Sequence, residues 1–139
     1  HYYTLAQFKD ELAMTLGGYV VEKMIYGEDQ ISTGPSSDLK NATKVAKDMV
    51  TRYGMSELGP RTFGEREEMI FLGKEIHEQQ DYSDKTAEKI DEEVIKIINE
   101  AQNKAREILE SKRDKLEEMV AVLLEKETIE QEEIKDILG

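Results

Sequence analysis

Two carboxylates, Asp38 and Glu22, occupy positions where an acidic side chain could serve chemistry. Asp38 follows a loop rich in Gly, Ser and Pro and falls at the start of a predicted helix, where a carboxylate can point at a ligand. Glu22 follows Gly17-Gly18 within an otherwise apolar stretch. The residues alone leave plainer roles open. Asp38 also suits a capping or dipole role in a first helical turn, and Glu22 suits an exposed helical position paired with a lysine.

Other catalytic arrangements are missing from the 139 residues. His1 and His77 are the two histidines, and neither belongs to a His-Glu-x-x-His pair, so the chain by itself offers no complete ligand set for a catalytic zinc. His77 lies among acidic neighbours, as an ordinary surface histidine does. Neither a Gly-x-x-x-x-Gly-Lys-Ser/Thr loop nor a Gly-x-Ser-x-Gly turn occurs. The absence of cysteine excludes disulfides, iron–sulfur clusters, thiolate zinc sites and cysteine nucleophiles.

The excess of acidic over basic residues argues against some classes of binding partner. There are 19 Lys plus Arg against 31 Asp plus Glu, a formal net charge of −12. This acidity argues against nucleic-acid binding, which needs a basic surface, and is typical of a solvated helical exterior. No stretch approaches the roughly 18 apolar residues of a membrane span, and no signal peptide opens the sequence. We therefore expect one domain that is not inserted in a membrane.

The elements that must carry Asp38 and Glu22 are predicted as follows. Thr4 and Gln7 form a capping box for a first helix, whose apolar positions recur at helical spacing and resume after the glycine pair. Two adjacent glycines are costly inside a helix, so either the helix ends there or another segment approaches its backbone closely; we favour a continued helix with a close contact at the pair. A loop over 27–35 follows, and Ser36 or Ser37 caps a second helix that stops at Gly54.

The rest of the sequence is also helical. Residues 55–82 are predicted to form a long irregular surface loop, punctuated by glycines. From Ser83 a helix of roughly seven turns follows, with a break near 111–114 and a last helix opened by a second capping box at Thr128. We expect an all-α fold with an N-terminal helix pair and a C-terminal antiparallel helical bundle.

Several motifs occur in order along the chain: Gly17-Gly18-Tyr19-Val20-Val21-Glu22-Lys23, Thr33-Gly34-Pro35-Ser36-Ser37-Asp38-Leu39, Met49-Val50-Thr51-Arg52-Tyr53-Gly54, Phe71-Leu72-Gly73 and Ile90-Asp91-Glu92-Glu93-Val94. Together they closely resemble the peptidase domain of the FtsH family of membrane-anchored, ATP-dependent zinc metalloproteases. The resemblance covers essentially the whole chain, as the C-terminal part of that domain: 1–54 carries the zinc-ligand motif, 55–82 the loop and 83–139 the bundle.

The resemblance implies a specific role for each acidic residue. In the family, zinc is held by two histidines of a His-Glu-x-x-His helix and by one aspartate, which the match places on Asp38. Glu22 matches a family carboxylate for which we favour an outer, supporting role. The general base, the Glu of His-Glu-x-x-His, has no counterpart here. Departures at Tyr19, Lys23 and Pro35, and a missing residue before Gly59-Pro60, leave the aspartate in place.

The resemblance also implies a parent protein. It would be a homo-hexamer that degrades unfolded or membrane proteins, with Zn²⁺ in the peptidase domain and ATP bound by a separate ATPase domain rather than by this chain. We expect a soluble domain on the cytoplasmic face of a bacterial inner membrane, with mitochondrion and plastid as alternatives. We expect no proteolysis by this chain alone. The rival hypothesis is a non-catalytic helical assembly or adaptor module of a hexameric ring.

Overall fold

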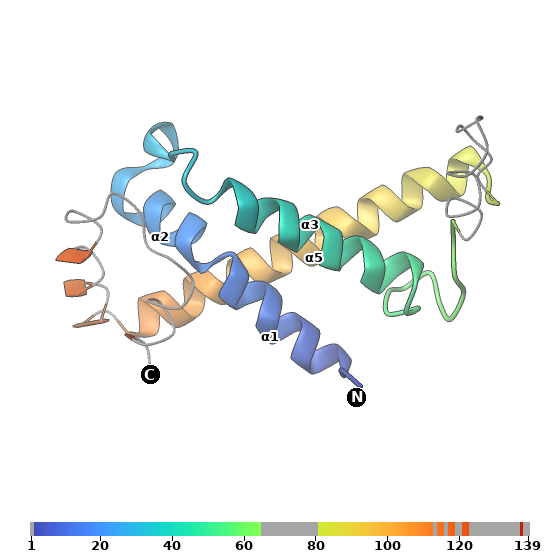
Figure 1. The fold of residues 1–139 in the computed structure, drawn as a ribbon, viewed down its shortest axis with the longest axis horizontal. Helices are drawn as coiled ribbons and strands as arrows, with labels where there is room; N and C mark the ends of the chain where they lie inside the picture. The colour runs from blue at the N-terminus through green and yellow to red at the C-terminus, as the bar shows by residue number, and fades with distance from the viewer. Residues whose placement is uncertain are drawn as a thin grey trace. The chain divides into compact units, whose positions relative to one another are not determined.

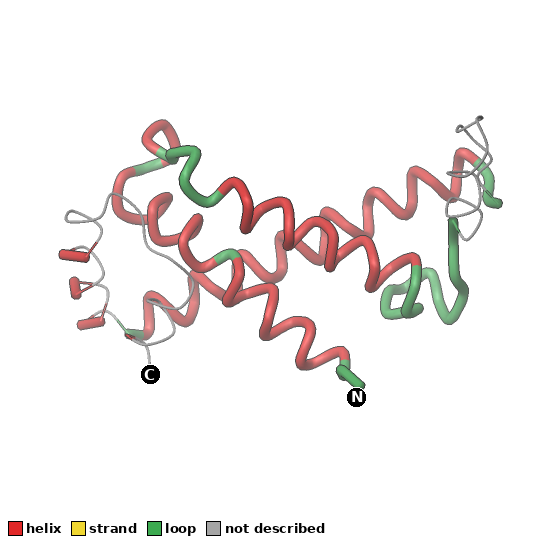
Figure 2. The backbone as a smooth tube through the Cα atoms, in the orientation of Figure 1, coloured by secondary structure: helices red, strands yellow, loops and turns green. Residues whose placement is uncertain are grey.

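The computed structural model describes residues 2–64 and 81–112, and beyond these residues 114, 115, 117, 118, 121, 122 and 137. Every regular element among them is helical, which confirms the all-α class (Figure 2). The elements are α1 (Leu5–Thr15), α2 (Gly17–Tyr26), the 3-10 helix η1 (Glu28–Gln30), α3 (Ser36–Thr51) and α5 (Asp84–Ser111) (Figure 1). None of the helices in these described ranges combines the length and apolarity needed to cross a membrane.

The first helix begins as predicted and ends earlier than predicted. Thr4 and Gln7 form the capping box, with each backbone N–H bonded to the other residue's side chain, at 2.8 and 3.1 Å. The helix then ends at Thr15 and a second one starts at Gly17, so the expected continuous helix is wrong. Leu16, with φ −86° and ψ 0°, forms the joint. The two glycines begin α2 and are buried there.

The loop and the helix that carries Asp38 follow the prediction closely. Residues 27–35 connect α2 to α3, with one short 3-10 turn inside them. Ser36 is the first residue of α3 rather than its cap, and the Pro35 carbonyl accepts the Leu39 N–H. Gly54, at φ +60°, follows the C-terminus of α3, where the Met55 N–H bonds the Met49 carbonyl. This closure over residues 49–55, with a left-handed glycine inside it, confirms the predicted stop.

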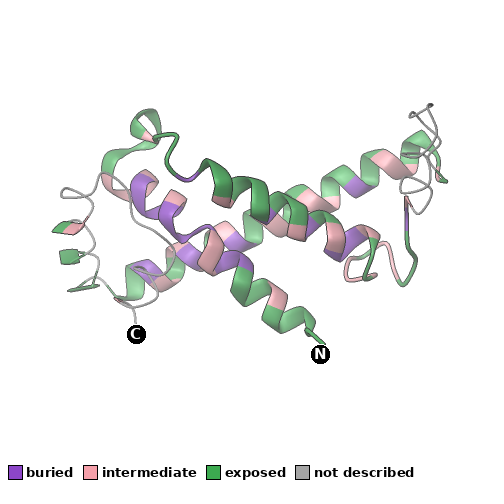
Figure 3. Cartoon of the chain, in the orientation of Figure 1, coloured by how far each residue is buried: buried purple, intermediate pink, exposed green. Residues whose placement is uncertain are grey.

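The chain divides into two compact units. One comprises His1–Thr43 and Ile98–Gly139, and the other comprises Lys44–Ile97. In the first, the end of α1, the buried side of α2 and the C-terminal part of α5 form a core whose buried members are Ala13, Val20, Val21, Ala105 and Leu109. The first turns of α1 are exposed, and burial starts at Leu12 and Ala13, near α2 (Figure 3).

The second unit has a core of its own. Val50 near the end of α3, Ile90 in α5 and Phe63 from the connecting segment pack together. Phe63 is 6% exposed and its ring meets that of Tyr82 edge-on, with centroids 5.7 Å apart. The segment after α3 is irregular, as predicted, but it is not purely a surface loop, because Phe63 anchors it. An aromatic side chain in a loop finds such a place only when tertiary packing provides one.

The long helix confirms the strongest periodic signal. It runs over 28 residues, Asp84–Ser111, and ends where the break was predicted. Ser83 precedes it and accepts the Thr86 N–H through its hydroxyl at 3.1 Å. Several predictions lie outside the described residues: the middle of the 55–82 loop, His77 within it, and the helix expected from Thr128.

Candidate functional site

Asp38 lies in the first turn of α3 and its side chain is half-buried. The predicted helix start is therefore correct, and the carboxylate lies where a helix N-terminus favours negative charge. Pro35, directly before the helix, is buried, so the entry of the chain into α3 is packed rather than loose. The first turn of α3 thus holds a carboxylate at a defined place in the first unit.

Glu22 is the one charged residue that is buried among the described residues, at 3% exposure. Its carboxylate accepts the Ser32 backbone N–H at 2.8 Å and the Ser32 hydroxyl at 3.1 Å. An exposed position paired with a lysine, the plainer reading of this residue, is therefore wrong. Lys23 next to it donates instead to the Gln102 side chain at 3.2 Å. A carboxylate withdrawn from water needs such donors, because an unpaired buried charge is strongly unfavourable.

These contacts connect the two acidic residues through the loop. Glu22 belongs to α2, Ser32 lies in the connecting loop, and Asp38 opens α3. The Ser32 hydroxyl also accepts the Gly34 N–H at 3.0 Å, and the Thr33 carbonyl accepts the Ser36 N–H at 3.1 Å. The structure thus places Glu22 against the loop that leads into Asp38, and all of these residues belong to the first unit.

The Asp38 carboxylate is a donor suited to one position of a metal site. Zinc takes carboxylate oxygens readily, but a catalytic site uses three protein ligands and leaves one position for water. Within the described ranges, no three His, Cys, Asp or Glu side chains cluster closely enough to hold a metal ion. The Asp38 carboxylate could therefore offer zinc one ligand, and the described residues do not complete a set of three around it.

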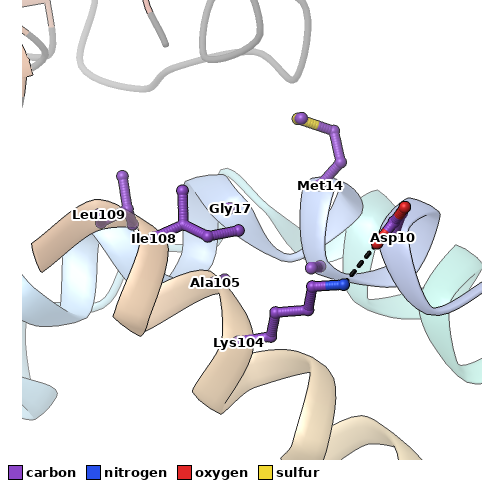
Figure 4. Close-up of a pocket in the computed structure, with 8 residues that line it drawn as sticks. Asp10, Met14, Gly17, Lys104, Ala105, Ile108 and Leu109 are labelled. Carbon is purple, nitrogen blue, oxygen red and sulfur yellow. Dashed lines mark hydrogen bonds and ion pairs between the residues drawn. The ribbon is translucent and has the colours of Figure 1, made fainter. Parts of the chain in front are cut away.

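A cavity of about 200 Å³ lies in the same unit, between α1 and α5. Its lining is nearly all apolar, and the Asp10–Lys104 ion pair lies at its side (Figure 4). The two charges are on α1 and α5 and neutralise each other across the helices. An apolar lining of this kind does not bind a metal ion or an activated water, so the cavity is distinct from the Asp38 region. Its lining residues are Asp10, Ala13, Met14, Gly17, Lys104, Ala105, Ile108 and Leu109.

Comparison with known families decides the assignment. The sequence model of peptidase family M41 matches residues 1–137 of the 139. The chain belongs to peptidase family M41. The resemblance to FtsH proteases that the motifs indicated is thereby confirmed.

Curated relatives of the M41 chain agree. An ATP-dependent zinc metalloprotease FtsH of Chloroflexus aggregans is 48% identical over 136 residues, covering 97% of this chain and 21% of that protein. FtsH 1 of Sphaerobacter thermophilus is 47% identical over 135 residues, covering 96% and 20%. FtsH of Thermotoga maritima is 44% identical over 131 residues, covering 94% and 21%. The M41 chain thus spans about a fifth of the length of the relatives it matches.

Ser32 is the residue of this candidate site that the sequence did not single out. A serine two residues before a glycine is typical of a local turn in which the hydroxyl accepts a backbone N–H. That signal could have predicted the Ser32–Gly34 bond. The bond to Glu22 could not be predicted in this way, because the two residues are ten positions apart and meet only when the loop folds back on α2.

Proposed function

We propose that this chain is the C-terminal part of the peptidase domain of an ATP-dependent zinc metalloprotease, in which Asp38 supplies one of three protein ligands to zinc. The observation that carries the proposal is the M41 match over nearly the whole chain, together with a half-buried carboxylate at the first turn of α3. Glu22 supports the site from outside it, by binding the loop that precedes α3.

The contribution of this chain to the reaction is binding and orientation. Zinc held there would supply Lewis-acid chemistry for peptide-bond hydrolysis. Asp38 would hold the metal through a carboxylate oxygen, and the fold of the first unit would set its direction. The two remaining ligands and the general base belong to a His-Glu-x-x-His helix, which this sequence does not contain.

The names of the relatives support a proposal for the whole protein. They are ATP-dependent zinc metalloproteases, and this chain covers about a fifth of each. We infer that a separate ATPase domain supplies the ATP dependence, that the protein acts on unfolded or membrane proteins, and that it assembles as a homo-hexamer. We infer further that it is membrane-anchored at the cytoplasmic face of a bacterial inner membrane.

The test compares two aspartates of the same helix in the complete gene product. Asp38→Asn is expected to lose bound zinc and casein cleavage while ATP hydrolysis is retained. Asp48→Asn is the matched control, because Asp48 lies on the same helix two to three turns further along, where its carboxylate pairs with Lys44 at 3.6 Å, and this variant is expected to keep both. Retention of stoichiometric zinc by Asp38→Asn would overturn the ligand assignment. A wild-type product that forms a ring and binds no zinc would instead support the assembly or adaptor hypothesis.

A further inference from the structure

We propose that Ser32 is the positioning residue for Asp38: it ties the loop before α3 to the buried carboxylate of Glu22 and so sets where Asp38 is presented. This inference rests on the proposed function, because it concerns the geometry of the same metal ligand. Ser32 itself would touch neither zinc nor substrate. Its effect on the site would pass through the backbone of the loop.

The fixed end of this connection is α2. Val20 and Val21 are fully buried, and they belong to the core that α2 forms with α1 and α5. Glu22 follows them directly, so its backbone cannot move without disturbing the packed core. Its carboxylate is therefore a stationary acceptor. A loop bonded to that acceptor takes its position from the core of the unit rather than from solvent.

Ser32 is suited to join this acceptor to the loop. Its backbone N–H and its hydroxyl both donate to Glu22, one to each carboxylate oxygen, at 2.8 and 3.1 Å. The same hydroxyl oxygen accepts the Gly34 N–H at 3.0 Å. A hydroxyl has one donor and two acceptor lone pairs, so it can make both bonds at once. Hydrogen bonds to a charged group are also stronger than those between neutral groups.

Successive hydrogen bonds link the backbone from Ser32 to Asp38. The Ser32–Gly34 bond is followed by that from the Ser36 N–H to the Thr33 carbonyl at 3.1 Å, which spans the next turn. The bond from the Leu39 N–H to the Pro35 carbonyl, at 3.0 Å, then encloses Asp38 itself. Because the turns overlap, a shift at Ser32 is transmitted to the first turn of α3. A metal ligand misplaced by a fraction of an ångström binds less tightly.

The experiment measures zinc affinity of the complete gene product by competition with a chromogenic chelator. Ser32→Ala keeps the backbone N–H bond and loses the hydroxyl. We expect its zinc affinity to fall about 10-fold, the lower end of the loss seen when a group bonded directly to a metal ligand is removed, because Ser32 acts through the loop backbone. Ser32→Thr keeps a hydroxyl and should bind zinc within about threefold of wild type. Amide hydrogen exchange over residues 27–38 gives a second readout, and it should be faster in Ser32→Ala alone.

Ser56 provides the matched control. Its hydroxyl also accepts a backbone N–H two residues on, that of Leu58 at 3.1 Å, but it lies in the second unit. Ser56→Ala should lose a comparable local turn and leave zinc affinity unchanged. If Ser32→Ala binds zinc as tightly as wild type, or if Ser56→Ala weakens it equally, the proposal is wrong.

Failure of the broader function has a different signature. If Asp38→Ala binds zinc as wild type does, Asp38 is no ligand and Ser32 has nothing to position, so both proposals fall. If Asp38→Ala loses zinc while Ser32→Ala retains it, the ligand assignment stands and the Ser32 proposal alone is overturned. The expected pattern is loss of zinc in Asp38→Ala, weakening in Ser32→Ala, and recovery in Ser32→Thr.

Discussion

The Glu22 carboxylate accepts both donors of Ser32, the backbone N–H at 2.8 Å and the hydroxyl at 3.1 Å, although ten residues separate them in sequence. This pair joins a buried helix to an exposed loop, and the loop opens directly into the helix that carries Asp38. A single buried charge therefore links the core of the first unit to the candidate metal ligand.

Removal of the Glu22 carboxylate should destabilise the chain. Glu22→Ala leaves both Ser32 donors without their acceptor and opens space beside Val21, so we expect a loss of about 1–3 kcal/mol in the free energy of unfolding. Glu22→Gln keeps one acceptor oxygen and should lose less. Urea unfolding of the 139-residue chain measures both. Glu28→Ala, at an exposed position in η1, is the control and should stay within about 0.5 kcal/mol of wild type.

Gly54→Ala should destabilise the second unit for two separate reasons. The left-handed backbone at φ +60° costs an alanine about 1–2 kcal/mol. An added Cβ would also lie 2.9 Å from the Pro60 Cα, a backbone atom that cannot move aside easily. Gly54→Asn separates the two causes, because asparagine tolerates the left-handed conformation but has the same Cβ. Full recovery of the urea midpoint by asparagine would show that the Pro60 contact is unimportant.

The pKa of Glu57 should depend on Lys96. The Lys96 ammonium donates a hydrogen bond to the Glu57 carboxylate at 2.6 Å, and this bond and the positive charge hold the Glu57 pKa below its ordinary value of 4.5. Because the folded-state pKa is lowered, the contribution to stability is complete above the ordinary pKa. It is lost as the pH falls through the lowered value. Both groups are largely exposed, so the contribution is small.

Lys96→Met should return the Glu57 pKa toward 4.5, as a carbon-detected NMR titration of the carboxyl group would show. Lys85→Met removes the same charge from an exposed position in the first turns of α5 and should leave the Glu57 titration in place. An unchanged Glu57 pKa in Lys96→Met would contradict the assignment of the shift to this pair.

The purified 139-residue chain should not cleave casein, with or without added zinc. One carboxylate cannot replace three ligands, and among the described residues no group of three suitable side chains comes together. The measurement is release of labelled casein peptides, with the complete gene product as the positive control. Zinc-dependent cleavage by the chain alone, abolished by Asp38→Ala, would show that the site is complete without further ligands.

Local sequence determined the helices because their signals are local. The Thr4–Gln7 capping box, the left-handed Gly54 and the 28-residue periodicity of α5 each act within a few residues, and the structure bears out all three. The sequence also indicated the family, because the family's motifs occur in order along the chain. The helix end at Leu16 was the alternative that the sequence favoured less, because apolar residues resume their helical spacing after the glycine pair and an interruption of one residue hardly changes that spacing.

Only the tertiary structure decided how the candidate site is held together. The sequence placed Asp38 at a helix start, but it gave Glu22 a plain surface role as readily as a functional one. Burial and hydrogen-bond partners depend on which segments fold against each other, and α2 meets the loop at Ser32 through contacts that no short-range pattern encodes. Phe63 shows the same limit, because its burial depends on Val50 and Ile90 from two distant helices. Local conformational preferences determine where helices form. The burial of a side chain and the atoms that pack against it depend on the tertiary structure as a whole.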